Sequence, residues 1–201
     1  MLKNKDFLVR PFLKVPLIRR ADPKLLTFLG LLFGIMIPFF LPLRLPFLAL
    51  FCLALSGLFD LLDGAVARHS NASSELGAVF DITSDRVVEF LIVLGLFLVV
   101  PEERGLMSLL MLGSILFCIT TFLVVGIFSV NTTEKSFYYS PGLIERGEAF
   151  AFFALMMVFP SVFTLLSSLF TGLVLLTGLI RIYQFFLNTS MPKTRKIKSN
   201  K

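Results

Sequence analysis

Residues 46 to 67 read PFLALFCLALSGLFDLLDGAVA, an apolar run that carries two aspartates near its end. A run of about twenty apolar residues is long enough to cross the roughly 30 Å hydrocarbon core of a bilayer as a helix. An acidic side chain at that depth costs free energy unless it faces a cavity, a partner or an ion. The stretch therefore predicts a membrane helix and a functional site near the end of that helix.

Similar apolar runs lie on both sides of this stretch, at residues 25 to 41, 77 to 100, 106 to 129, 145 to 160 and 162 to 187. The composition agrees with a membrane protein, because 56% of the 201 residues are hydrophobic and 24 are phenylalanine,. The sequence predicts an all-α integral membrane protein with six transmembrane helices. We find no internal repeat, and we expect a single domain over residues 1–201.

Basic residues predict the orientation of this bundle. They crowd residues 3 to 24 before the first run and residues 193 to 201 after the last. Segments on the cytoplasmic side are enriched in Lys and Arg, so both termini and the end that holds the aspartates are expected to be cytoplasmic. Tight turns are expected on the outer side at residues 101 to 105 and at Pro160 with Ser161.

The two ends of the chain have a composition of their own. Residues 1–22 mix apolar and basic side chains, which favours an amphipathic helix on the inner leaflet, with a disordered basic leader as the alternative because Pro11 and Pro16 interrupt it,. Residues 192–201 are expected to form a disordered basic tail. Since the basic residues flank the apolar runs, the net charge of +6 indicates anionic lipids as partners and no nucleic acid,.

Four aspartates carry the chemistry that we predict. Asp60 and Asp63 lie near the end of the second apolar run, and Asp81 and Asp85 lie near the start of the third. Residues three or four apart share one face of a helix, and we expect the two helices to be antiparallel neighbours whose acidic ends meet. Carboxylate oxygens suit Mg²⁺ or Mn²⁺, and two ions would balance four carboxylates. A two-metal site of this kind can hold a pyrophosphate, which favours phosphoryl-type transfer.

Small and basic residues separate the two pairs of aspartates. Gly64, Ala67 and Gly77 would allow a phosphate or a ribose to approach the helices closely, and Arg68 offers a guanidinium fork to phosphate oxygens,. Ser73 or Ser74 is a candidate cap for the helix that follows.

The spacing of these residues resembles the signature of the CDP-alcohol phosphotransferase family. The signature runs Asp60, two residues, Asp63, Gly64, two residues, Ala67, Arg68, eight residues, Gly77, three residues, Asp81, three residues and Asp85. Every fixed position matches. The resemblance implies a six-helix membrane fold in which Asp60, Asp63 and Asp81 bind a pair of metal ions. It also implies that Asp85 is a metal ligand and the general base toward the acceptor.

The resemblance further implies the reaction and the binding site for its donor. The reaction is the transfer of a phosphatidyl-type group from a CDP-activated lipid alcohol to a small alcohol, with release of CMP, as in phospholipid biosynthesis. The residues implied in binding the CDP-lipid are Pro23, Thr27, Gly64, Ala67, Arg68, Ser74 and Gly77. Pro23 to Thr27 is similar to a Pro-x-x-x-Thr element of the family, although Lys24 stands where many members carry Asn.

Two further charged residues are candidates for a role. Arg146 could bind the charge of an acceptor, contact a phosphate, or mark the inner membrane boundary. Glu89 continues the face of Asp81 and Asp85 by one turn, so it could tune the site or pair with Arg86. Residues 129 to 135 contain one basic residue, which argues against an acceptor that carries a phosphate of its own.

Two other classes of protein remain as alternatives. An intramembrane prenyltransferase also uses aspartate-rich motifs with metal, but it would be expected to have more than six spans. A cation transporter could hold buried aspartates, although it has no need for the small residues at fixed spacing. Gly30 and Gly34 predict close helix contacts, either within the chain or in a homodimer,.

Overall fold

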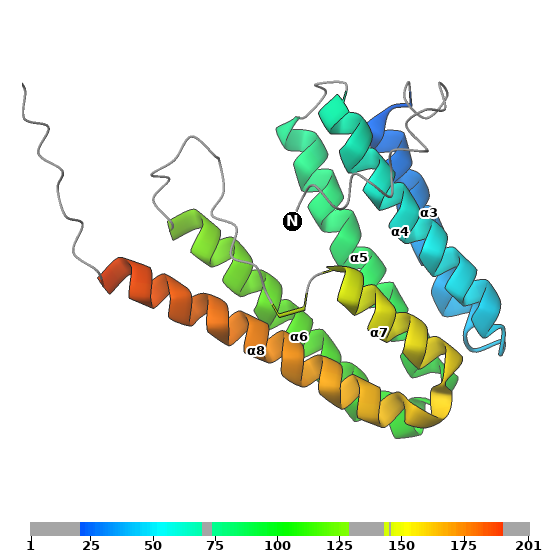
Figure 1. Cartoon of the computed structure of the whole chain (residues 1–201). Coiled ribbons are helices and arrows are strands. Elements are labelled where there is room, and N and C mark those ends of the chain that lie inside the picture. The colour runs from blue at the N-terminus through cyan, green and yellow to red at the C-terminus, as the bar shows by residue number, and fades with distance from the viewer. Residues whose placement is uncertain (1–20, 70–73, 129–142, 145, 191–201) are drawn as a thin grey trace, which may run out of the picture.

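The computed structural model describes residues 21–69, 74–128, 143–144 and 146–190, and every regular element in these ranges is a helix. In chain order they are α3 (Pro23–Phe40), α4 (Pro46–His69), α5 (Glu75–Val99), α6 (Pro101–Phe128), α7 (Arg146–Val158), the 3₁₀-helix η1 (Pro160–Val162) and α8 (Phe163–Ser190) (Figure 1). The all-helical prediction is therefore confirmed within these residues. Residues 1–20 of the predicted leader and the predicted tail at 192–201 lie outside them.

Within the described residues, four helical segments are long and apolar enough to cross a membrane. They are α3, α4, α6 and the stretch Pro160–Leu187, which joins η1 to α8. The other two helices differ for physical reasons. Helix α5 has 25 residues but carries several ionisable side chains, and α7 has only 13 residues, which span about 20 Å at 1.5 Å per residue,. The prediction of an integral membrane protein is confirmed, with four candidate spans.

Helix α3 packs along both α4 and α5, whereas α4 and α5 have little contact with each other. Two glycines of α3 make these close approaches possible. A Cβ atom at Gly30 would lie 3.3 Å from the carbonyl oxygen of Ser56 on α4, and one at Gly34 would lie 2.7 Å from a methyl carbon of Val88 on α5. Helices α4 and α5 therefore do not pack along each other, because α3 packs against both, but their acidic ends meet as predicted.

The second half of the chain packs around a different pair. Helices α6 and α8 lie side by side, and α7 packs against α4 and α8 (Figure 1). Phe153 of α7 and Phe170 of α8 are almost fully buried, with ring centroids 5.2 Å apart, and they share one apolar core with Ile92 and Leu96 of α5. This core joins the two halves and fixes where the charged ends of α4, α5 and α7 meet.

The sequence predicted two turns on the outer side, and the structure confirms one of these turns. The turn at Pro160 is confirmed, since the chain reverses there through η1. The predicted turn at residues 101 to 105 is wrong, because α6 already begins at Pro101 and the chain bends at Val100, where φ is −149° and ψ is 80°. Proline suits the first position of a helix, where its missing N–H has no partner to lose.

Candidate active site

The site begins at the first turn of α3. Asp22 is the N-cap, and its carboxylate accepts a hydrogen bond of 2.9 Å from the backbone N–H of Lys24. Pro23 occupies the first helical position,. One turn later, the hydroxyl oxygen of Thr27 lies 2.5 Å from a carboxylate oxygen of Asp63 on α4 and 3.1 Å from the carbonyl oxygen of Pro23. The start of α3 therefore positions an aspartate of α4.

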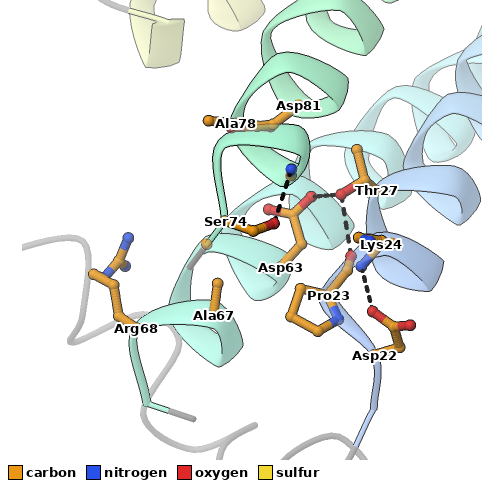
Figure 2. A pocket seen from close by; sticks show the side chains of 12 residues that line it. Asp22, Pro23, Lys24, Thr27, Asp63, Ala67, Arg68, Ser74, Ala78 and Asp81 are labelled. Atoms are coloured by element: carbon orange, nitrogen blue, oxygen red, sulfur yellow. Dashed lines mark hydrogen bonds between the residues drawn. The ribbon is translucent and has the colours of Figure 1, made fainter. Parts of the chain in front are cut away.

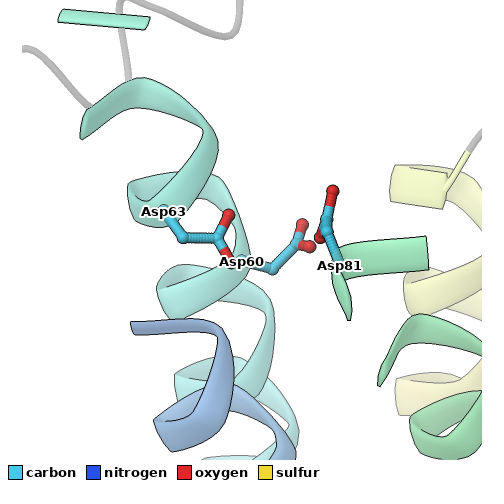
Figure 3. A group of neighbouring side chains, drawn as sticks. All are labelled: Asp60, Asp63 and Asp81. Carbon is cyan, nitrogen blue, oxygen red and sulfur yellow. The ribbon is translucent and has the colours of Figure 1, made fainter. Parts of the chain in front are cut away.

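Three of the four predicted aspartates form one cluster. Asp60 and Asp63 of α4 and Asp81 of α5 point toward one another (Figure 3), and each offers a carboxylate oxygen within 4.8 Å of the other two. Asp63 is buried, with 4% of its surface exposed. One oxygen of Asp81 is buried without a hydrogen-bond partner among the described residues. We call these three residues the acidic cluster.

Asp85 lies beside the acidic cluster and is held by an arginine. The Nη1 atom of Arg146, at the start of α7, is 2.5 Å from an oxygen of Asp85 and 2.5 Å from an oxygen of Asp60. Arg146 thus bridges α4 and α5 across the site. Glu89, one turn beyond Asp85, forms an ion pair of 2.6 Å with Arg86, so its predicted pairing is confirmed.

Among the described residues around the acidic cluster, negative charge exceeds positive charge. The cluster and its surroundings hold five carboxylates, those of Asp60, Asp63, Asp81, Asp85 and Glu89. Arg86 and Arg146 compensate two of them, and Arg68 brings a third positive charge on the other side of Gly64. Carboxylates brought together in a poorly hydrated place repel one another unless cations join them. The surplus charge therefore favours a bound cation.

The acidic cluster fits a hard divalent cation in its chemistry as well as in its charge. All the donors are carboxylate oxygens, which Mg²⁺ and Mn²⁺ prefer,. One oxygen of Asp81 is buried without a hydrogen-bond partner in the part of the chain that the structure describes, and a buried acceptor of this kind is destabilising unless something binds it,. Neither the identity nor the number of ions follows from these contacts.

A cavity of about 510 Å³ opens directly onto the cluster (Figure 2). Its lining includes all seven residues predicted to bind the CDP-lipid: Pro23, Thr27, Gly64, Ala67, Arg68, Ser74 and Gly77. Asp63 and Asp81 belong to both the cavity and the acidic cluster. Pockets of 300 to 1,000 Å³ are typical of small-molecule and cofactor sites. A ligand bound in this cavity would therefore lie next to the carboxylates.

The contacts of two lining residues explain why a serine is found at position 74 and a glycine at position 64. The hydroxyl of Ser74 accepts a hydrogen bond of 3.0 Å from the backbone N–H of Gly77, so Ser74 is the predicted N-cap of α5,. A Cβ atom at Gly64 would lie 3.2 Å from an amino nitrogen of Arg68. Glycine at this position therefore leaves room for the guanidinium of Arg68 at the rim of the cavity.

Some residues of the site were not predicted from the sequence. Asp22, Lys24 and Ala78 also line the large cavity, and the buried hydroxyls of Ser56 and Ser84 lie beside Asp60 and Asp85. The Asp22-Pro23 pair could have been found, since an aspartate before a proline is a helix N-cap signal. The two serines could not, because a serine in an apolar run also satisfies its hydroxyl on its own helix.

The chain was compared with families of known proteins. The family model for CDP-alcohol phosphatidyltransferase matches residues 21–186. The inner membrane protein YnjF of Escherichia coli is 30% identical over 172 residues, which cover 82% of this chain and 83% of YnjF. The match therefore extends over α3 to α8 and is not confined to the aspartate motif.

Solved structures with the same fold come from Mycobacterium tuberculosis. Its phosphatidylinositol phosphate synthase (PgsA1), crystallised with CDP-DAG bound, superimposes with a TM-score of 0.70 at 20% identity, covering 90% of this chain and 93% of that protein. A second structure of the same enzyme, in complex with manganese and citrate, also gives a TM-score of 0.70, at 19% identity over 90% of this chain and 88% of that one. The likeness at this level of identity concerns the fold.

Proposed function

Because the chain belongs to the CDP-alcohol phosphatidyltransferase family, we propose that its cavity binds the CDP part of a CDP-activated lipid and that the adjoining carboxylates serve the transfer. The enzyme moves a phosphatidyl-type group from this donor to a small alcohol and releases CMP. The membership of the family removes the two alternatives, a prenyltransferase and a cation transporter. One observation carries the proposal: Asp63 and Asp81 line both the nucleotide-sized cavity and the acidic cluster.

We assign the donor to the 510 Å³ cavity between α3, α4 and α5. Arg68 would bind phosphate oxygens with its guanidinium fork, and Gly64 and Gly77 would let the nucleotide approach the backbone. Pro23, Thr27, Ala67 and Ser74 would line the rest of the nucleotide site. Thr27 also orients Asp63, which supports a positioning role for its hydroxyl. The lipid tails of the donor would extend into the bilayer.

Asp60, Asp63, Asp81 and Asp85 would hold Mg²⁺ or Mn²⁺, with two ions as the proposed number. A divalent cation at this place supplies positive charge that polarises phosphoryl oxygens and offsets the charge of the leaving phosphate. The three carboxylates of the acidic cluster support the assignment most directly, since their oxygens already converge. Asp85 would join them once Arg146 moves away from it.

Asp85 is proposed as the general base. The hydroxyl of the acceptor would transfer its proton to Asp85, and the resulting oxygen would attack the lipid-side phosphorus. The bond from that phosphorus to the oxygen of CMP would break, and CMP would leave with the electron pair. Asp85 suits this role because it lies beside the acidic cluster and next to Arg146, where the acceptor could arrive from α7.

Arg146 is proposed to bind the acceptor in the working enzyme. Its guanidinium lies between Asp60 and Asp85, close to the place of the reacting oxygen. An acceptor with a negative group would compete with these carboxylates for Arg146 and would release Asp85 from it. A comparison of CMP release with charged and with uncharged acceptors would identify the acceptor.

We also propose that all six helices cross the membrane, with the acidic end and both termini in the cytoplasm. Asp81 of helix α5 meets the aspartates of α4 and Asp85 meets Arg146 of α7, while Val79, Val87 and Phe90 expose apolar side chains. A helix whose charges face inward can lie in a bilayer despite them. Cysteine labelling from either side of sealed vesicles would test the orientation, with Leu43 and Leu76 as positions at opposite ends. Labelling of both from the same side would contradict it.

The function is tested by the release of CMP from CDP-diacylglycerol. Purified protein in detergent is supplied with Mg²⁺ or Mn²⁺ and with one acceptor at a time, namely glycerol phosphate, serine, inositol, inositol phosphate or ethanolamine. We expect CMP release that requires both a divalent cation and one of these acceptors. An assay without cation serves as the control. The absence of CMP release with every acceptor, or CMP release that persists in excess chelator, would contradict the proposal.

A further inference from the structure

A second cavity lies at the opposite end of the bundle from the acidic cluster. It has a volume of about 400 Å³ and forms where the last turns of α3, α5 and α7 meet the first turns of α4 and α6. Its lining residues are Leu41, Pro42, Arg44, Pro46, Leu96, Val99, Val100, Arg104, Met156, Met157 and Pro160. Nine of them are apolar, so most of the wall would accept a hydrocarbon chain. We call this the far cavity.

The only charged residues in this lining are two arginines. Arg104 is buried, with 5% of its surface exposed. Its guanidinium donates hydrogen bonds of 2.9 Å to the carbonyl oxygen of Leu96 and 3.3 Å to that of Pro160, and it lies 4.3 Å from the ring centroid of Phe163. These partners are dipoles and an aromatic face, which carry no net charge. The positive charge of Arg104 is therefore not neutralised by them.

Neither arginine forms an ion pair with a carboxylate of the residues that the structure describes. Glu103 attracts the positive charge of Arg104, but Glu102 and Glu103 are both exposed and neither lines the far cavity. Two positive charges that share a largely apolar cavity repel each other, and burial adds to the cost of the charge on Arg104,. An anion between them would offset both effects.

Arg44 has an unusual backbone conformation that bears on its role. Its φ of 59° is in the left-handed region, which disfavours residues other than glycine and asparagine,. The N–H of Arg44 donates to the carbonyl of Leu41 at 3.0 Å, and the N–H of Leu45 donates to that of Phe40 at 3.1 Å, so the turn between α3 and α4 is tight. Arginine has no advantage for such a turn. Its side chain, at the rim of the far cavity, offers a reason for its presence.

We propose that the far cavity binds the phosphate headgroup of an anionic phospholipid, with one acyl chain along the apolar wall. Arginine is the side chain best suited to phosphate, because its planar fork can donate two hydrogen bonds at once. The cavity lies at an end of the bundle, where headgroups of a bilayer would be found. Inorganic phosphate shares the recognition by the arginines, but it makes no use of the wall formed by Leu41, Leu96 and Met156.

Photolabelling of the full chain tests this proposal. The protein is placed in phosphatidylcholine nanodiscs with a trace of a phospholipid that carries a photoreactive acyl chain and either a glycerol or a choline headgroup. We expect the anionic probe to label residues 96–104 and 156–160 more strongly than the zwitterionic probe. An arginine near a membrane surface favours an anionic lipid by about fivefold, so Arg44→Asn should reduce this labelling by about that factor.

The variants are chosen so that folding is preserved. Asparagine tolerates the left-handed conformation of Arg44, and Leu43→Asn makes the same exposed turn more polar without removing a charge,. Leu43→Asn should leave the labelling unchanged, and labelling elsewhere on the bundle is an internal control for both variants. Thermal unfolding followed by circular dichroism checks that both fold like the wild type.

Three results would overturn the proposal. One is equal labelling of the far cavity by the two headgroups, and another is equal labelling of the wild type and Arg44→Asn. The third comes from a competition arm, in which excess anionic phospholipid or millimolar inorganic phosphate is added. Competition by lipid alone supports a lipid site. Displacement of the probe by inorganic phosphate at that concentration would instead identify a site for the free anion.

Discussion

The two ends of the bundle hold cavities of similar size and opposite charge. The cavity at the acidic cluster measures about 510 Å³ and is lined by Asp63 and Asp81, while the far cavity measures about 400 Å³ and is lined by Arg44 and Arg104. Helices α3, α4 and α5 contribute to both. The shape of a cavity in this bundle therefore says little about its ligand. The charge that the protein leaves uncompensated at each end is what distinguishes them.

One arginine at each end of the bundle shows the same difference. Arg146 contacts two carboxylates, so it lowers the negative charge of the acidic end without removing it. Arg104 contacts two carbonyl oxygens and a phenylalanine ring, so its charge remains at the far end. Substitutions at the acidic end should therefore alter cation binding and CMP release. Substitutions at the far cavity should alter the binding of anions.

The largest expected effect is that of Asp81→Asn. The substitution removes the charge of a proposed metal ligand, one oxygen of which is buried without a hydrogen-bond partner among the described residues, and it keeps the size of the side chain. Loss of metal-supplied charge stabilisation amounts to several kcal/mol, so CMP release should fall by at least about 10³-fold. Binding of Mn²⁺, followed by electron paramagnetic resonance, should weaken in parallel. Lipid labelling of the far cavity should stay at the wild-type level.

Asp22→Asn is the matched control for this variant. Asp22 lines the same cavity but lies outside the acidic cluster, and asparagine caps a helix as well as aspartate does,. The activity should remain within a few fold of the wild type. Equal losses in the two variants would mean that any carboxylate in the cavity matters, and the assignment of metal ligands would fail.

Asp85→Asn should have the next largest effect. It keeps the hydrogen-bonding shape toward Arg146 but cannot take a proton from the acceptor. General base catalysis contributes about 10²-fold or more, and turnover should fall by that amount. Binding of CDP-diacylglycerol, measured by calorimetry, should be retained because Asp85 does not line the donor cavity. Turnover at the wild-type level would exclude Asp85 as the base.

Thr27→Val should have a moderate effect, because it removes the hydroxyl that lies 2.5 Å from Asp63. Residues that orient metal ligands are worth about 10- to 100-fold in metal affinity or activity. We expect a loss in this range in Mn²⁺ affinity and in CMP release. Thr83→Val is the control, since the hydroxyl of Thr83 is exposed and contacts only its own helix. Similar losses of Mn²⁺ affinity and CMP release in both variants would contradict the role of Thr27 in orienting Asp63.

Much of the acidic end could be predicted from the sequence, because the positions of its aspartates depend on spacing within single helices. Aspartates three or four residues apart must share a helix face, and acidic side chains in apolar runs must face inward. The spacing therefore brought Asp60, Asp63 and Asp81 together correctly, and the family resemblance supplied the seven residues that line the cavity beside them. The helical ranges followed from the length of the apolar runs.

What could not be predicted depends on contacts between distant segments. Helix α3 packs closely on both α4 and α5 through two glycines, and the partners of these glycines, Ser56 and Val88, are far away in the sequence. The bridge from Arg146 to Asp60 and Asp85 joins residues 86 and 61 positions apart. The far cavity has no motif at all, because its lining comes from the ends of five helices. Only the folded chain brings these residues to one place.

Gly34→Ala should have the smallest effect among these variants, and it tests whether the two ends are independent. Gly34 is near the middle of α3, where an added Cβ atom would lie 2.7 Å from a methyl carbon of Val88. Valine is stiff at χ1, so α3 and α5 must move apart, which costs about 1 to 3 kcal/mol. Thermal unfolding followed by circular dichroism should show a lower Tm.

Gly113→Ala on α6 is the matched control, because nothing lies within 4 Å of its added Cβ atom, and its Tm should be unchanged or slightly higher,. If the ends are independent, Gly34→Ala should lower CMP release through α5, which carries Asp81 and Asp85, and leave the labelling of the far cavity intact. A joint loss at both ends would mean that the packing of α3 on α5 couples them. A change in the packing of α3 on α5 would then affect both cavities together.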